Sequence, residues 1–151
     1  MPALSLAAPP AAQAGVPRFR AEPPLAVRDL LLLVEDDLPV ATLLMHVLAR
    51  SGRRVLHARD GADCLRLFDK NAAAIRLVFM DCSLPDIHGG TLCQRLRATL
   101  PGLPILLTSG RGQPGLVALL AADGPTAFLP KPFLPADLLR QVEAVLAIAA
   151  G

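Results

Sequence analysis

Acidic side chains directly follow two of the short apolar runs in this sequence. Glu35 and Asp36 come after the run Leu30–Val34, and Asp81 comes after the run Leu77–Met80. Carboxylates that are gathered together repel one another unless a cation neutralises them, and oxygen ligands suit Mg²⁺. A fold that brings these two acidic positions together would therefore hold a divalent cation.

Groups that could bind an anion follow two further apolar runs. Thr108 and Ser109 end the run that begins at Ile105, and Lys131 comes shortly after the run Ala127–Leu129. An Asp that faces both a hard cation and an ammonium group can attack phosphorus, because phosphoryl transfer depends mainly on positioning and charge neutralisation. Each residue alone is more often a helix cap, a turn residue or a solvated charge. Their shared position after strands predicts a phosphoryl-acceptor site.

The elements that must position these residues alternate between strands and helices. Buried strands are predicted for five apolar runs: Leu30–Val34, Val55–Ala58, Leu77–Met80, Ile105–Thr108 and Ala127–Leu129. Helical spacing of apolar residues predicts five helices: from Asp37 to Gly52, from Asp60 or Gly61 onward, from Gly89-Gly90 to about Leu100, Leu116–Ala122, and from Pro135 onward. Right-handed crossovers then favour an α/β fold with a five-stranded, doubly wound parallel sheet, βα repeated five times. Ligands of such sheets bind at the carboxyl ends of the strands.

The composition favours one folded domain. The chain has 151 residues and a mean hydropathy of +0.48, which excludes a wholly disordered protein. No apolar run approaches the ~18 residues that a membrane span needs. A net charge of +2 and the lack of Trp and Tyr disfavour nucleic-acid binding. Residues 1–27 include 14 Ala or Pro, and we interpret them as a flexible tail, rather than a secretory signal, before a domain at 28–151.

Cysteine usage points to a reducing compartment. The chain has three cysteines, Cys64, Cys82 and Cys93, without C-x-x-C spacing. This number and spacing disfavour a disulfide framework and a zinc site. We therefore expect reduced thiols in a cytoplasmic protein.

Four segments, in this order, resemble the motifs of a response-regulator receiver domain. They are Leu31–Asp37, Met80–Gly89, Pro104–Gly110 and Phe128–Phe133. The resemblance covers about residues 29–149 and implies a flavodoxin-like fold and a bacterial two-component or phosphorelay system. It implies that Asp81 accepts a phosphoryl group from a phosphohistidine on a sensor histidine kinase or a histidine phosphotransfer protein.

The resemblance also implies a metal site for Mg²⁺ or Mn²⁺. Asp36 and Asp81 would be direct ligands, and the main-chain carbonyl of Ser83 would be a further one. Glu35 would act on the metal through water, at a position where the family often has Asp.

Further roles follow from the same resemblance. Counting from Pro104 places Ser109, and not Thr108, at the family's hydroxyl position. Lys131 would contact the phosphoryl oxygens, and the Lys131–Pro132 peptide bond would be cis. The backbone at Cys82 and Gly110 would contact the phosphoryl group as well. Phe128 matches the switch aromatic that biases the face of the fourth helix, fifth strand and fifth helix, although plain core packing is the alternative for this side chain.

Other functions of the same fold match the sequence less well. An FMN binder would need a phosphate-binding loop after the first strand, where this chain has three acids. A P-loop NTPase would need the motif G-x-x-x-x-G-K-[ST], which is absent from the sequence. A phosphatase of the haloacid-dehalogenase type would need an Asp two residues after Asp81, where this chain has Ser83. We expect a signalling switch, not an enzyme, with only its own phosphorylation and dephosphorylation chemistry. Three residues after the last helix indicate the single-domain type.

The role within a signalling system leaves alternatives open. A single-domain regulator, a phosphorelay intermediate or phosphate sink, and an unphosphorylated interaction module all remain. We expect a monomer or weak homodimer that meets a downstream protein and neither nucleic acid nor membrane. Two side hypotheses concern His46, which is more simply a packed or surface residue than a phosphohistidine, and Arg111, which could tune the lifetime of the phosphoryl group.

Overall fold

The computed structural model describes residues 29–151, so the predicted tail at residues 1–27 lies outside the described part. Strands and helices alternate along the whole described chain. The order is β1 (Leu30–Val34), α1 (Leu38–Arg50), β2 (Arg54–Ala58), α2 (Gly61–Asn71), β3 (Ile75–Asp81), α3 (Gly89–Thr99), β4 (Ile105–Ser109), α4 (Pro114–Ala121), β5 (Thr126–Pro130) and α5 (Pro135–Ala150). Every predicted element is present. Most strands are a residue or two longer than their apolar runs, and α4 begins at Pro114, two residues before the predicted start.

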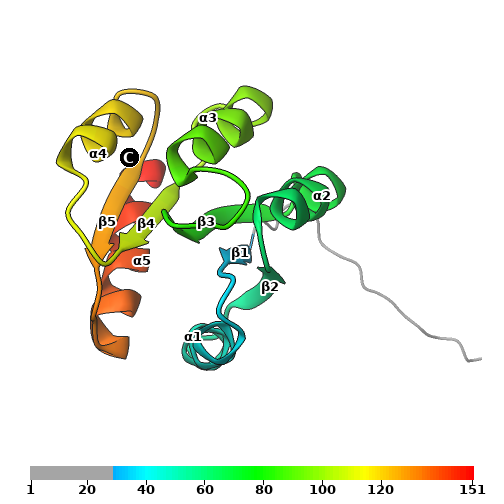
Figure 1. Ribbon diagram of the computed structural model, residues 1–151, viewed down its shortest axis with the longest axis vertical. Coiled ribbons are helices and arrows are strands. Elements are labelled where there is room, and N and C mark those ends of the chain that lie inside the picture. The colour runs from blue at the N-terminus through cyan, green and yellow to red at the C-terminus, as the bar shows by residue number, and fades with distance from the viewer. Residues whose placement is uncertain (1–28) are drawn as a thin grey trace, which may run out of the picture.

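The five strands form one parallel sheet in the order β2-β1-β3-β4-β5. Figure 1 shows α1 and α5 on one face of this sheet and α2, α3 and α4 on the other. The strand order reverses at β1, so β1 and β3 lie side by side at the switch point, where doubly wound sheets bind ligands. The predicted fold class, a doubly wound parallel α/β sheet, is confirmed.

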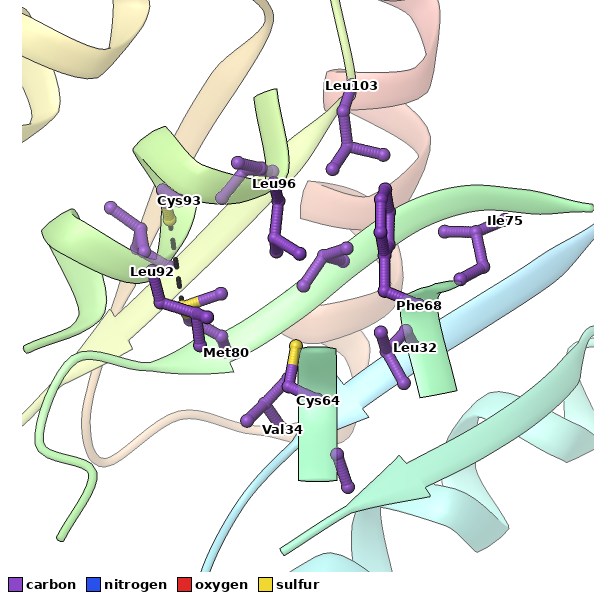
Figure 2. Packing of buried hydrophobic residues seen from close by; sticks show 14 of the residues in the cluster. Leu32, Val34, Cys64, Phe68, Ile75, Met80, Leu92, Cys93, Leu96 and Leu103 are labelled. Carbon is purple, nitrogen blue, oxygen red and sulfur yellow. Dashed lines mark hydrogen bonds between the residues drawn. The ribbon is translucent and has the colours of Figure 1, made fainter. Parts of the chain in front are cut away.

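Apolar side chains fill the space on both faces of the sheet. One cluster joins the strands to α2, α3 and α4, with Phe68, Leu96 and Leu103 among its fully buried members (Figure 2). The other joins them to α1 and α5 through Leu48 and Phe79. Because successive strand residues point to opposite faces, a strand covered on both sides must be apolar throughout, which explains the unbroken runs in the sequence.

Local signals set the helix boundaries near the site. The side chain of Asp37 accepts the Val40 N–H at 3.2 Å and begins α1, and the side chain of Asp60 accepts the Asp63 N–H at 2.8 Å and begins α2. Gly52 follows α1 with a φ of 89°, a conformation that only glycine adopts without strain. The Asp37 cap fixes where β1 ends and α1 begins, directly beside the acidic cluster.

Candidate functional site

The acidic residues come together at the carboxyl ends of β1 and β3. Val34 pairs with Met80 in the sheet, so the chain that leaves β1 at Glu35 passes beside Asp81, the last residue of β3. Oxygen atoms of Glu35, Asp36 and Asp81 all lie within 4.8 Å of one another. Parallel pairing thus brings together acids that are 45 residues apart in the sequence.

Two of these three carboxylates are buried. Glu35 is 2% and Asp81 6% exposed, whereas Asp36 faces solvent. Backbone donors hold the buried pair: the Asp37 N–H lies 3.1 Å from Glu35 Oε2, and the Ser83 N–H lies 2.8 Å from Asp81 Oδ1. Burial raises the pKa of Glu35 above its usual value, and the negative charge of Asp81 raises it further, although the Asp37 N–H and Lys131 oppose the shift.

Lys131 supplies an ammonium group to the same cluster from the other side of β4. Its Nζ lies 2.5 Å from Asp81 Oδ2 and 3.7 Å from Glu35 Oε1. The backbone N–H of Lys131 donates to the Ser109 carbonyl at 2.9 Å, and the Lys131–Pro132 bond is cis, as predicted. Burial alone lowers the pKa of Lys131, but the hydrogen bond and charge of Asp81 outweigh it, so the pKa is raised above its usual value.

The charges in the cluster fit a divalent cation. Three carboxylates against the ammonium of Lys131 leave a net charge of −2 when all are ionised. The donor set is made of oxygens only, the ligand type that Mg²⁺ prefers, and one carboxylate is open to solvent, as suits an ion that keeps several waters. The residues present therefore fit the predicted metal.

The two hydroxyls at the end of β4 have different surroundings. Thr108 is buried and its Oγ1 donates to the Leu129 carbonyl of β5 at 2.7 Å. Ser109 is also buried, but its Oγ accepts the Arg111 N–H at 3.3 Å, which leaves the serine proton free for another acceptor. The Thr108 hydroxyl is thus used within the sheet, and the Ser109 hydroxyl is the one that could serve a ligand.

The loop after β3 closes the site. Gly89 begins α3 so close to Cys82 that an added Cβ would lie 2.8 Å from the Cys82 Cα. The carboxylate of Asp86 accepts the N–H groups of Gly61 at 2.8 Å and Ala62 at 2.9 Å, and these bonds hold its pKa below the usual value. This loop is therefore tied to the first turn of α2, an arrangement that sequence reasoning did not predict.

The remaining candidate residues lie around this centre. The Cys82 N–H, predicted as a phosphoryl contact, donates to the Thr108 carbonyl at 2.9 Å, and the backbone donor that meets Asp81 is that of Ser83. Gly110 follows β4 directly, with nothing within 4 Å of an added Cβ. Phe128 is half-buried and packs against the cluster below α2, α3 and α4. The roles of these residues stay predictions.

One contact to the acidic cluster was missed altogether. His57 of β2 places its Nε2 2.8 Å from the Glu35 carbonyl oxygen. β2 is the neighbour of β1 in the sheet, and the pairing of His57 with Leu33 carries the imidazole to this position. The signal was present in the sequence only as a histidine in the predicted strand Val55–Ala58.

A cavity of about 490 Å³ lies beside the site, between the loop after β3 and the loop after β4. Its lining includes Cys82, Ser83, His88, Arg111 and Gln113. The exposed Arg111 side chain thus borders a space that Cys82 and Ser83, the two residues after Asp81, also line. Its effect on the lifetime of a phosphoryl group stays a prediction. Among residues 29–151, no helix is long and apolar enough to cross a membrane.

Fold and site together define a class of protein: a doubly wound α/β domain with an acidic cluster and an ammonium group at the carboxyl edge of its sheet. The family model of the response regulator receiver domain matches residues 31–143. The chain belongs to this family, the receiver domains of two-component signalling systems.

Relatives and solved structures agree with this assignment. The chain is 35% identical over 116 residues to the protein PetR of Rhodobacter capsulatus, covering 77% of this chain and 48% of PetR. It is 31% identical over 115 residues to the sensor kinase CckA of Brucella abortus, covering 76% of this chain and 12% of CckA. Among solved structures, the receiver domain of NtrX from Brucella abortus aligns with a TM-score of 0.69 and 27% identity, covering 78% of this chain and 98% of that one. The chain thus spans half or less of the length of these two relatives.

Proposed function

We propose that this receiver domain accepts a phosphoryl group on Asp81 from a phosphohistidine of a partner protein, with Mg²⁺ bound at the acidic cluster. The observation that carries the proposal is the surrounding of Asp81: one carboxylate oxygen meets Lys131, the other meets the Ser83 N–H, and two further acids lie within ligand distance. A nucleophilic carboxylate needs these neighbours because both it and a phosphoryl group are negatively charged.

The proposed reaction moves one phosphoryl group from an imidazole nitrogen of the partner to a carboxylate oxygen of Asp81. A carboxylate oxygen of Asp81 forms a bond to phosphorus while the bond from phosphorus to the imidazole nitrogen breaks, and the imidazole of the partner takes up that electron pair. Lys131 then moves its hydrogen bond from the carboxylate to the phosphoryl oxygens. Asp36, Asp81 and the Ser83 carbonyl would hold the metal, with Glu35 acting through water, and the bound ion would neutralise charge on the phosphoryl oxygens.

The response to phosphorylation would start at Ser109. Its free hydroxyl proton and the N–H of Gly110 are available for a phosphoryl oxygen, and Phe128 lies on the neighbouring strand, at the face formed by α4, β5 and α5. A changed face would be met by a downstream protein. Water would remove the phosphoryl group in time, so the domain is a signalling switch rather than an enzyme with turnover on a separate substrate.

Intact-protein mass after incubation with acetyl phosphate and Mg²⁺ tests the proposal. We expect one added phosphoryl group in the wild type, none in Asp81→Asn, and none with EDTA, with recovery when Mg²⁺ or Mn²⁺ is returned. Asp69→Asn on the exposed side of α2 is the matched control and should phosphorylate like the wild type. No adduct and no Mg²⁺ binding would leave the unphosphorylated interaction module as the better description.

A second experiment separates a switch from a phosphorelay intermediate or phosphate sink. Partner capture from a lysate would be compared for phosphorylated protein and Asp81→Asn. A protein retained only by the phosphorylated form indicates a switch with its own target. Retention of kinases or phosphotransfer proteins alone indicates a relay or sink.

A further inference from the structure

A buried arginine joins four parts of the fold at the amino-terminal edge of the sheet. Arg97, in the last turn of α3, is 6% exposed. Its Nε donates to the Leu103 carbonyl at 3.0 Å and its Nη1 to the Leu120 carbonyl at 2.5 Å. Its Nη2 donates to the Pro125 carbonyl at 2.7 Å and to Thr126 Oγ1 at 2.9 Å. A guanidinium group can make this fork of bonds because its donors are planar and fixed in direction.

The partners of Arg97 show what it holds. Leu120 lies at the carboxyl end of α4, Leu103 precedes β4, and Pro125 and Thr126 lead into β5. The last turn of α4 contains no basic side chain, so the positive charge that favours a helix carboxyl end comes from α3. Gly124 lies against the guanidinium group, where an added Cβ would be 3.0 Å from Arg97 Cζ.

The amino end of α4 is held differently. Gln113 makes no capping hydrogen bond with its side chain, and residues 110–113 connect this end directly to Ser109. The close contact with α3 is apolar, since a methyl of Leu116 fills the space that a Cβ on Gly90 would occupy, at 2.6 Å. Apolar contacts have no preferred direction and allow sliding, whereas four hydrogen bonds to one rigid group do not.

We propose that Arg97 is a positioning residue that anchors the carboxyl end of α4 to the amino ends of β4 and β5, so that α4 moves at its amino end, beside Ser109. The anchoring stands by itself, whereas its use in signalling rests on the proposed function. With one end fixed, a shift at Ser109 rotates α4 about Arg97 and changes the face of α4, β5 and α5 without separating α4 from the sheet.

Amide hydrogen exchange of the full chain, followed by mass spectrometry, tests the anchor. Arg97→Lys keeps the charge but loses the fork. Thr126→Val removes one of the four bonds of Arg97, together with the bond that Thr126 Oγ1 donates to the Gly124 carbonyl at 3.0 Å. We expect exchange in residues 118–128 to rise at least tenfold in Arg97→Lys and by a smaller factor in Thr126→Val. Exchange in α1 should stay within twofold of the wild type. Arg95→Lys, an exposed arginine on the same helix, is the matched control and should behave like the wild type.

The same samples, treated with acetyl phosphate and Mg²⁺, report on motion. In the phosphorylated wild type we expect exchange to change in residues 110–117 and to stay constant in 118–128, and in Arg97→Lys the change should extend into 118–128. Unchanged exchange in both variants, or an equal rise in every segment, overturns the anchor. A change of equal size at both ends of α4 in the wild type overturns the pivot.

Intact mass separates failure of the anchor from failure of the proposed function. A wild type that takes up no phosphoryl group and binds no Mg²⁺ refutes the proposed function and with it the pivot in signalling, while the unphosphorylated variants still decide the anchor. If Arg97→Lys does not fold, the milder Thr126→Val decides by the same comparison.

Discussion

The two neighbouring hydroxyls at the end of β4 allow stability and phosphorylation to be separated by single substitutions. Thr108→Val removes a buried donor and leaves the Leu129 carbonyl, 2.7 Å away, without this bond. The loss costs about 1–3 kcal/mol in the free energy of unfolding, because a buried acceptor gives up a partner that water does not replace. For a domain of this size we expect the Tm to fall by about 4 °C for each kcal/mol.

Ser109→Ala should leave the stability of the domain nearly unchanged and slow its phosphorylation. Its Oγ accepts a backbone N–H from the exposed Arg111 at 3.3 Å, a donor that can turn to water instead. We therefore expect a change in unfolding free energy within about 0.5 kcal/mol. Phosphorylation should suffer, because the serine hydroxyl is the group left free for a phosphoryl oxygen.

Two assays check the pair. The chain has no Trp or Tyr, so thermal and urea unfolding are followed by far-ultraviolet circular dichroism. The initial rate of phosphorylation by acetyl phosphate is followed by intact mass at saturating Mg²⁺. The reasoning is refuted if Thr108→Val has the same Tm as the wild type. It is also refuted if Thr108→Val slows phosphorylation of folded protein as much as Ser109→Ala does.

Two further predictions concern packing and buried thiols. Gly89→Ala should destabilise the domain by about 1–3 kcal/mol, because the added Cβ would press on the Cys82 backbone. Gly115→Ala in α4, where an added Cβ would have nothing within 4 Å, should be neutral or stabilising. Equal midpoints of urea unfolding for the two variants would contradict this. Burial raises the pKa of Cys64 and Cys93 to about 12 and that of Cys82 to about 11, so all three thiols stay protonated at pH 8. We expect no iodoacetamide adduct in native protein within the time that unfolded protein takes up three, and fast native labelling at any one thiol would contradict its burial.

Much of the fold could be predicted because its signals are local. The run Leu30–Val34 has to be apolar on both faces to lie in a covered parallel strand, and Asp37 caps the helix after it with its own side chain. Such periodicity and capping depend on residues a few positions apart. The same locality explains the error at α4, where the predicted helix begins at Leu116 and leaves out Pro114, although Pro suits the first turn of a helix.

The order of the motifs predicted which residues would meet at the site, but not how they are connected. Which atom of Asp81 faces Lys131, 50 positions away, follows from the strand order and from the register of β4 with β5. The contact of His57 with the Glu35 carbonyl and the tie between Asp86 and the start of α2 have no signal in residue spacing. They arise only when separate elements have packed.

The sequence by itself determined the alternation of strands and helices and the set of acids, hydroxyl and lysine at the strand ends, because residue type and short-range spacing carry that information. Tertiary structure decided how these groups are used. Of two adjacent hydroxyls, it engages Thr108 in the sheet and leaves the Ser109 proton free, and it buries Arg97 among carbonyls of three segments. These outcomes depend on the register and packing of segments far apart in the chain, which set the direction of each side chain.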